Sequence, residues 1–230
     1  MKALILAAGK GTRLKELTKE IPKVMLDVGG KPCLRYNIEL LKKHGITEIA
    51  INTHVFPEQI KNYFGDGSKF GVKIKYSYEP IILGTSGALN NFREIFDDTF
   101  IVVYGDVIHQ TNLAEMIKLH KQKRAFATLA LDDRDSTGKG VVLLDKEFKV
   151  LKFVEKPEER IPGTLINSGI YILEPEILEN IPEGFSDFGK DIFPRLLESG
   201  KKMYGFKTEK VIDIGTLEVL EMARKLFSEK

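Results

Sequence analysis

The first thirty residues contain an apolar run that leads into a loop of glycines and cations. Ala3-Leu4-Ile5-Leu6-Ala7 predicts a buried strand, Ala8-Gly9-Lys10-Gly11-Thr12-Arg13 follows it directly, and Pro22-Lys23 comes shortly afterwards. Glycines let backbone N–H groups approach an anion closely, Arg13 offers a planar fork for two phosphate oxygens, and Lys23 adds a mobile charge. These residue types at this spacing predict a loop that binds a triphosphate.

Positive charge is concentrated around this loop. Residues 1–31 hold seven Lys and Arg and three acidic residues, a local charge of +4, whereas the whole chain carries +2. A Walker A loop would need Gly-Lys-Ser/Thr, and a dinucleotide fingerprint would need a third glycine where Leu14 stands. The loop therefore matches neither standard motif, and its cations favour anion binding over a purely structural turn.

Two aspartates follow other predicted strands. The apolar run 100–104 leads into Gly105-Asp106, and Val211-Ile212 leads into Asp213. Ligands of open α/β sheets collect beyond the carboxyl ends of the strands, so we expect these carboxylates to meet the cationic loop. Either aspartate alone could be a turn residue beside a glycine. Together they favour a Mg²⁺ site, because Mg²⁺ is usually held by one or two carboxylates and substrate phosphates.

The elements that must position these residues are predicted from hydrophobic periodicity. Strand patterns at 3–7, 48–52, 72–76 and 99–104 alternate with helical patterns at 32–44, 57–64, 85–96 and 112–121. Later residues predict strands at 125–131, 140–144, 150–154, 166–173, 202–206 and 211–214, and helices at 189–198 and 217–227. We expect an α/β fold with a mixed, mainly parallel central sheet, helices on both faces and a small antiparallel portion.

Composition limits the class of protein. A chain of 230 residues with 43% hydrophobic and 30% charged residues predicts one domain, with a nucleotide-binding half at 1–124 and a second half at 125–230. The near-neutral charge argues against a nucleic-acid partner, and no apolar stretch is long enough to cross a membrane. The absence of room for a signal peptide before the first strand, and a single Cys33, predict the cytoplasm.

Six segments, in order and in spacing, resemble the sugar-1-phosphate nucleotidylyltransferases, also called nucleotide-sugar pyrophosphorylases, over essentially the whole chain. They are Leu6 to Arg13 with Pro22-Lys23, Leu83-Gly84-Thr85-Ser86-Gly87-Ala88-Leu89, Gly105-Asp106, Phe153-Val154-Glu155-Lys156-Pro157, Asn167-Ser168-Gly169-Ile170-Tyr171 and Asp213-Ile214-Gly215-Thr216. The resemblance implies a Rossmann-like nucleotidyltransferase fold. It also implies a reaction in which a sugar-1-phosphate oxygen attacks the α-phosphorus of an NTP and expels pyrophosphate.

The resemblance also implies roles for individual residues. Arg13 and Lys23 would neutralise the reacting phosphates, and Asp106, as the third catalytic residue, would hold Mg²⁺ together with Asp213. The nucleotide would contact Ala7, Ala8, Gly9, Gly11, Thr12, Arg13, Lys23, Glu79, Gly84 and Thr85. The sugar phosphate would contact Gly140, Glu155, Lys156 and Asn167. Without the resemblance, Glu155-Lys156 would be interpreted as a solvated charge pair and Asn167 as a turn residue.

The motifs are closest to single-domain relatives of the mannose-1-phosphate guanylyltransferase type, which favours GTP and mannose-1-phosphate or a related sugar. A uridylyl- or thymidylyltransferase acting on a hexose-1-phosphate stays open, as do a phosphocholine-type cytidylyltransferase and a nucleotide-sugar-binding regulator without activity. Leu217 stands where many relatives have proline, and the chain stops before the C-terminal β-helix domain that many relatives carry. The sequence is compatible with a homo-oligomer but does not predict one.

Overall fold

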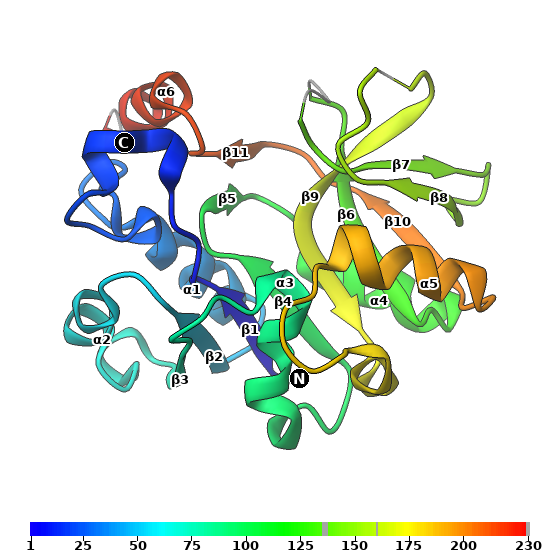
Figure 1. Cartoon of the computed structure of the whole chain (residues 1–230), viewed down its shortest axis with the longest axis horizontal. Helices are drawn as coiled ribbons and strands as arrows, with labels where there is room; N and C mark the ends of the chain where they lie inside the picture. Colours follow the sequence, from blue (N-terminus) through cyan, green and yellow to red (C-terminus); the bar gives the residue numbers. More distant parts are fainter. Residues whose placement is uncertain (135–137, 160, 229–230) are drawn as a thin grey trace. The chain divides into compact units, whose positions relative to one another are not determined.

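The computed structural model describes residues 1–134, 138–159 and 161–228, which form two compact units (Figure 1). The first unit contains Met1–Ile82, Val103–Gln110 and the chain from Lys210 onward, and the second contains Leu83–Val102 and Thr111–Glu209. This division differs from the expected one at residue 124. The chain passes between the units several times. Its last part, from Lys210 onward, belongs to the same unit as its first residues.

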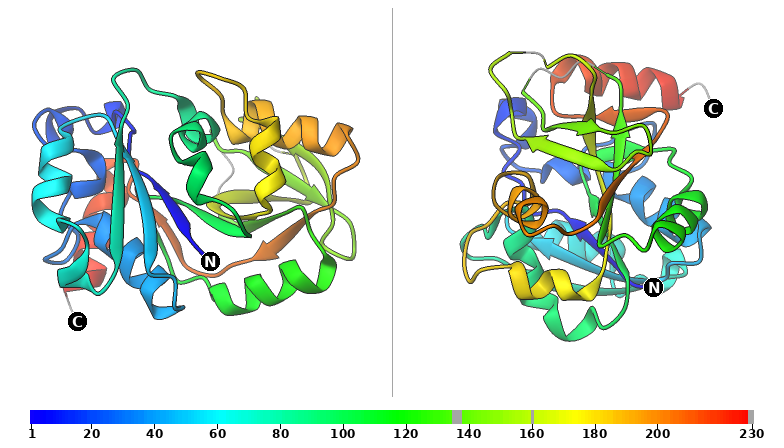
Figure 2. Two further views of the ribbon diagram at one scale, coloured as in Figure 1. Left: turned by 90° about the horizontal axis from the view of Figure 1, so that it is seen from below. Right: turned by 90° about the vertical axis from the view of Figure 1, so that its right-hand side faces the viewer.

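A parallel sheet forms the centre of the first unit. Its strands are β1 (Ala3–Leu6), β2 (Glu48–Thr53) and β3 (Lys73–Tyr78), which lie side by side in this order (Figures 1 and 2). β1 and most of β2 are buried, as expected for parallel strands covered on both faces. Because the strands run the same way, the loops after β1, β2 and β3 leave from the same edge.

The helices of the first unit follow from amphipathic patterns. In α1 (Cys33–Lys43), the side chains of Leu34, Ile38 and Leu41 are fully buried. Two lysines lie in its last turn, where the helix dipole stabilises positive charge. α2 (Pro57–Phe64) has proline in its first turn and Gly65 with φ 57° at its end. α6 (Leu217–Ser228) contributes Leu220 and Ala223 to an apolar cluster with Leu14, Leu26, Val28, Cys33, Ile108 and Ile214.

Two short strands complete the first unit. β5 (Val107–His109) pairs antiparallel with β11 (Val211–Asp213), and Asp213 lies opposite Val107. The sequence predicts β11 but not β5, because three residues after a glycine turn give too short a pattern.

The second unit is built on a mixed sheet. β6 (Ala127–Asp132) pairs in parallel with β10 (Met203–Lys207) and antiparallel with β9 (Thr164–Leu173). β7 (Val141–Leu144) pairs antiparallel with β8 (Val150–Val154) and β9. α4 (Leu113–Lys123) packs on β6 and β10, and α5 (Phe193–Glu198) packs on β8. The strand β4 (Phe100–Tyr104) belongs to the second unit up to Val102 and to the first unit from Val103 onward. The expected mixed α/β sheet with an antiparallel portion is confirmed.

Two predicted helices of the second unit are wrong in detail. Residues 85–96 form the one-turn α3 (Gly84–Gly87) and a 3₁₀ stretch, Ala88–Ile95, in which Phe92 leaves helical geometry with φ −135°. Burial of Phe92 and Phe96, whose rings contact each other, takes precedence over a regular helix. Residues 188–192 form a π-helix before α5, and Pro194, which has no N–H to donate, lies in the first turn of α5, where proline is tolerated.

No helix in the described part of the chain is long and apolar enough to span a membrane.

Candidate active site

The cationic loop after β1, Lys23, Asp106 and the turn at Gly215 surround a cavity of about 190 Å³ in the first unit. These parts of the chain are far apart in sequence, and the fold brings them to one place. The lining residues are Gly9, Gly11, Thr12, Arg13, Lys23, Asp106 and Gly215.

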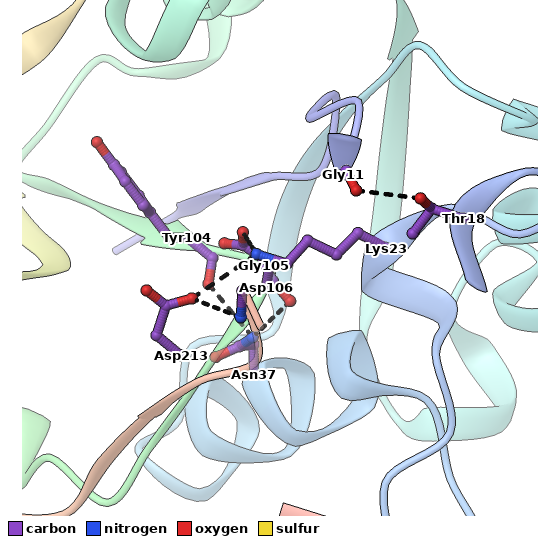
Figure 3. Close-up of polar contacts among 9 residues, drawn as sticks. Gly11, Thr18, Lys23, Asn37, Tyr104, Gly105, Asp106 and Asp213 are labelled. Carbon is purple, nitrogen blue, oxygen red and sulfur yellow. Dashed lines mark hydrogen bonds and ion pairs between the residues drawn. The ribbon is translucent and has the colours of Figure 1, made fainter. Parts of the chain in front are cut away.

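The loop after β1 folds back tightly on the segment that carries Lys23. Gly11 has φ 65°, and a methyl group on it would lie 3.1 Å from the Lys23 Cβ atom, so this position requires glycine. The Gly11 carbonyl accepts hydrogen bonds from the Leu14 N–H and from the Thr18 hydroxyl, both at 3.0 Å (Figure 3). The loop is therefore closed by hydrogen bonds to the Gly11 carbonyl, and Gly11 itself lies close to Lys23.

Lys23 places its ammonium group between two carboxylates. The residue opens a 3₁₀ turn after Pro22, and its side chain is 6% exposed. The Nζ atom donates to Asp106 Oδ2 at 2.5 Å and lies 3.7 Å from Asp213 Oδ1 (Figure 3). A buried ammonium needs such partners to offset its desolvation, and here the three charged groups carry a net charge of −1.

The two carboxylates come together because of β5 and β11. Asp106 lies in the turn between β4 and β5, and the pairing of β5 with β11 puts Asp213 opposite Val107, the next residue. Asp213 is further fixed by the Gly215 N–H, which donates to its Oδ1 atom at 3.0 Å. The sequence predicts both aspartates at strand ends, and the short strand β5 explains why they meet.

Arg13 lies at the exposed side of the cavity. Its guanidinium group packs on Gly215, where a methyl group would lie 2.8 Å from Nη2 and 2.9 Å from Asp213 Oδ1. Any side chain at Gly215 would therefore displace Arg13 or Asp213. Arg13 thus presents its donors at the cavity while Lys23 is buried against the acids.

The donor set fits a magnesium ion that also binds phosphate. Within residues 1–134, 138–159 and 161–228, no group of three or more His, Cys, Asp and Glu side chains could form a self-sufficient metal site. Asp106 and Asp213 supply two carboxylates, and Mg²⁺ typically uses one or two of these and completes its octahedron with phosphate oxygens and water. The site suits a cation that arrives with a phosphorylated substrate.

A buried hydrogen-bonded chain supports the start of the loop. Asn52, at 1% exposure, accepts from the Ala7 N–H through Oδ1 and donates through Nδ2 to Glu79 Oε1, both at 2.8 Å. Glu79 is also 1% exposed, and Ala8 is buried beside Ala7. Glu79 therefore acts on Ala7 through Asn52, a residue that the sequence does not single out.

In the second unit, Gly84 and Thr85 are held by the segment 186–189. Gly84 has φ 80° and contacts the Ser186 carbonyl so closely that a side chain has no room. Thr85 Oγ1 accepts from the Phe188 N–H at 2.9 Å, and the hydroxyl groups of Ser86 and Ser186 are hydrogen bonded at 2.8 Å. Ser86 and Ser186 are 100 residues apart in sequence, so their hydrogen bond could not be predicted from either segment.

The expected sugar-phosphate residues are also neighbours in the second unit. A methyl group on Gly140 would lie 2.7 Å from Glu155 Oε2, and the Asn167 N–H donates to the Gly140 carbonyl at 2.9 Å. Lys156 is exposed, with its Nζ atom 3.9 Å from Glu155 Oε1. Gly189 packs equally closely on Glu155, so the segment 186–189 contacts both this group and Gly84-Thr85. Sequence reasoning missed Gly189.

Burial controls the charge of Glu155. Burial raises the pKa of its carboxyl, and the charge of Asp187 adds to this effect, while Lys156 and Lys190 oppose it. Asn167 donates to the Tyr171 hydroxyl at 2.7 Å and accepts from the Gly169 N–H at 3.2 Å. These two hydrogen bonds hold the Asn167 amide in a fixed orientation, and an amide and a carboxyl can both read hydroxyl geometry.

Known proteins share this architecture over nearly the whole chain. Residues 2–229 match the nucleotidyl transferase family. The chain is 42% identical to the UTP–glucose-1-phosphate uridylyltransferase of Synechocystis sp., over 94% of this chain and 60% of that protein. It is 36% identical to the mannose-1-phosphate guanylyltransferase of Mycobacterium tuberculosis, over 89% of this chain and 58% of that protein.

A solved structure agrees as closely. HddC from Yersinia pseudotuberculosis, complexed with GMP-PN, superposes with a TM-score of 0.82 at 30% identity, over 98% of this chain and 99% of that chain. The chain therefore spans about three fifths of the two curated relatives but nearly all of HddC.

Proposed function

The chain belongs to the nucleotidyl transferase family, and from this premise we propose that it transfers a nucleotidyl group from an NTP to a sugar-1-phosphate, releasing pyrophosphate. The observation that carries the proposal is the cavity in which Arg13, Lys23 and Asp106 meet, with Asp213 at its edge. A cationic loop beside paired carboxylates suits phosphoryl chemistry. The Synechocystis and Mycobacterium tuberculosis relatives both carry names of sugar-1-phosphate nucleotidylyltransferases.

The chemistry requires little from the protein beyond position and charge. Two anions must be brought together, so the main barrier is their repulsion and the negative charge that develops on the leaving pyrophosphate. Arg13, exposed at the cavity, would bind the triphosphate with its planar fork, and the glycine loop would present N–H groups to it. No protein nucleophile is needed for a direct in-line displacement.

Asp106 and Asp213 would hold Mg²⁺. When bound, the ion would neutralise phosphate charge and orient the two substrates. In the structure Lys23 offsets one of the two negative charges, and its ammonium group would also be available to the phosphates. Lys23 would then contact the reacting groups from within the protein.

The sugar phosphate would be bound by the second unit. Glu155 would accept hydrogen bonds from sugar hydroxyls, Asn167 would contact another hydroxyl, and Lys156 would neutralise the phosphate. Because Gly140 and Gly189 carry no side chain, the Glu155 carboxyl has room beside them. These groups also disfavour an alcohol phosphate such as phosphocholine, which has no hydroxyl pattern to recognise.

We favour GTP and mannose-1-phosphate, or a related sugar, as substrates. The likeness to HddC, whose structure holds GMP-PN, and to a mannose-1-phosphate guanylyltransferase supports this pair. UTP and glucose-1-phosphate form the second candidate, because the Synechocystis uridylyltransferase is 42% identical. The identity of the base and the identity of the sugar are proposals separate from the transfer reaction itself.

A substrate matrix tests the proposal. Purified protein is mixed with Mg²⁺, each of five NTPs and a set of sugar-1-phosphates, and pyrophosphate release is measured. We expect release with GTP and mannose-1-phosphate, and a loss of roughly a hundredfold to a thousandfold in Asp106→Asn, the size typical for removal of one key electrostatic group. Asn keeps the shape of the side chain but loses the charge.

Asp66→Asn is the matched control, since Asp66 is exposed and belongs to the same unit. Its activity should equal that of the unchanged protein. Nucleotide binding without turnover on any sugar-1-phosphate would instead indicate a regulator. Near-normal turnover by Asp106→Asn would remove Asp106 from the mechanism.

A further inference from the structure

A fully buried asparagine lies beneath the turn that carries Asp106. Asn37 is on α1 and has 0% exposure. Its Nδ2 group donates to the Gly105 carbonyl at 3.2 Å and approaches the Tyr104 carbonyl at 3.5 Å (Figure 3). Asn37 therefore contacts the backbone of the two residues that precede Asp106.

The cost of burying this amide makes it unusual on α1. Its Oδ1 atom is buried without a hydrogen-bond partner, whereas nearby inward positions of the same helix carry Leu34, Ile38 and Leu41. An unpaired buried polar atom lowers stability, and an apolar residue of the same shape would avoid the loss. Packing alone therefore does not explain asparagine at this position.

The peptide group that Asn37 contacts belongs to the turn between β4 and β5. The Gly105 N–H donates to the Leu6 carbonyl at 2.9 Å, which ties the turn to β1. A methyl group on Gly105 would lie 2.8 Å from the same carbonyl, so the turn sits directly on the strand. Asn37 fixes the carbonyl of the same residue, and with it the peptide plane from which Asp106 projects.

The same face of α1 lies close to both acids. Cys33 is one turn before Asn37 and is fully buried. Burial raises the pKa of its thiol, and the negative charges of Asp106 and Asp213 raise it further while Lys23 opposes them. The first turns of α1 thus form the floor of the charged cluster.

We propose that Asn37 is a positioning residue, which sets the place of the Asp106 carboxylate and thereby the affinity of the site for a divalent cation. This inference rests on the proposed function, because it takes Asp106 to be a metal ligand. Asn37 is fully buried and does not line the cavity, so it would act through the Gly105 and Tyr104 carbonyls. Its loss should therefore weaken metal binding more than it affects the other phosphate contacts.

Mn²⁺ binding tests the inference without any need for turnover. The full chain is titrated with Mn²⁺, and the free ion is followed by electron paramagnetic resonance. We expect Asn37→Leu, which keeps the shape but cannot donate, to bind about tenfold more weakly. The Mn²⁺ affinity of Asp106→Asn shows how much binding is left when one of the two carboxylates is lost. In activity assays, the half-saturating Mg²⁺ concentration should rise by a similar factor, while KM for the sugar-1-phosphate stays within about twofold.

Ile38→Val is the matched control, because Ile38 is the adjacent, fully buried residue of α1 and makes no polar contact with the turn. It should leave Mn²⁺ binding unchanged. Circular dichroism establishes that each variant is folded, and Asn37→Ala replaces Asn37→Leu if the larger side chain prevents folding. Mn²⁺ binding equal to that of the unchanged protein in a folded variant would overturn the inference.

The two proposals fail in different ways. If the unchanged protein releases no pyrophosphate with any substrate pair, the proposed function fails, whatever Mn²⁺ shows. If it is active but Asn37 variants keep its metal dependence, only the positioning role fails. If Mn²⁺ binds no better to the unchanged protein than to Asp106→Asn, the positioning role fails as well.

Discussion

Lys23 controls the charge of the first unit's cavity. Its ammonium group lies 2.5 Å from Asp106 and 3.7 Å from Asp213, and the side chain is almost completely buried. Two carboxylates this close to each other would repel without a cation between them. Lys23 therefore stabilises the two acids, and it would compete with the proposed metal ion for the same oxygens.

Removal of that ammonium should tighten metal binding while it stops the reaction. We expect Lys23→Met, which keeps the length of the side chain, to bind Mn²⁺ roughly tenfold more tightly, a change of about 1.4 kcal/mol in binding free energy. Turnover should fall sharply, because a phosphate contact is lost. Electron paramagnetic resonance and pyrophosphate release measure the two effects separately. Weaker Mn²⁺ binding by a folded Lys23→Met would show that Lys23 organises the acids instead of competing for them.

Pairs of short elements decide the geometry of the site. The sequence predicts strands before Asp106 and at Val211–Ile212, and a glycine loop after β1, from local patterns alone. It could not predict that β5 pairs with β11, nor that Asn37 and Asn52 hold the loops, because these contacts join residues 45 to about 100 positions apart. A polar residue inside an otherwise apolar strand or helix face was the available signal.

A buried histidine joins three elements of the second unit. His120 lies on α4. Its Nδ1 atom is 2.8 Å from Thr128 Oγ1 on β6, and its Nε2 atom is 2.8 Å from Oε1 of Glu174, the residue after β9. A carboxylate only accepts, so Nε2 carries the proton and Nδ1 of the neutral ring accepts from the threonine hydroxyl. Burial lowers the pKa of His120, although Glu174 opposes the shift. The ring thus stays neutral in the folded protein at neutral pH.

This histidine should make stability fall as the solution becomes acidic. Because its pKa is lower in the folded state than the ordinary value near 6.5, the unfolded chain takes up a proton first as the pH drops below about 6.5. The free energy of unfolding, measured by urea titration from pH 7.5 to 5, should therefore decrease. In His120→Gln the decrease should be smaller. Burial also lowers the pKa of His44, so His44→Gln should likewise make the decrease smaller. An identical pH slope in His120→Gln and the unchanged protein would contradict this expectation.

At the scale of the whole molecule, periodicity predicts most elements but not the division of the chain. The α/β class and nearly all strands are confirmed within a few residues. The halves expected around residue 124 differ from the observed units, because β5 and the C-terminal residues belong with β1. Local patterns hold no information on which distant segment an element will pack against. Asp213 reaches Asp106 only through this return of the chain.

The return of the chain should make the first unit depend on its last helix. Leu220 of α6 is fully buried in the cluster that contains Leu14, the residue after Arg13, so Leu220→Ala should lower the free energy of unfolding by about 2–5 kcal/mol. Met222 on the same helix is 53% exposed, and Met222→Ala should change the value by less than about 0.5 kcal/mol. Urea unfolding followed by circular dichroism measures both. Equal, small losses would mean that α6 adds little to the first unit, and that β11 holds Asp213 beside Asp106 without it.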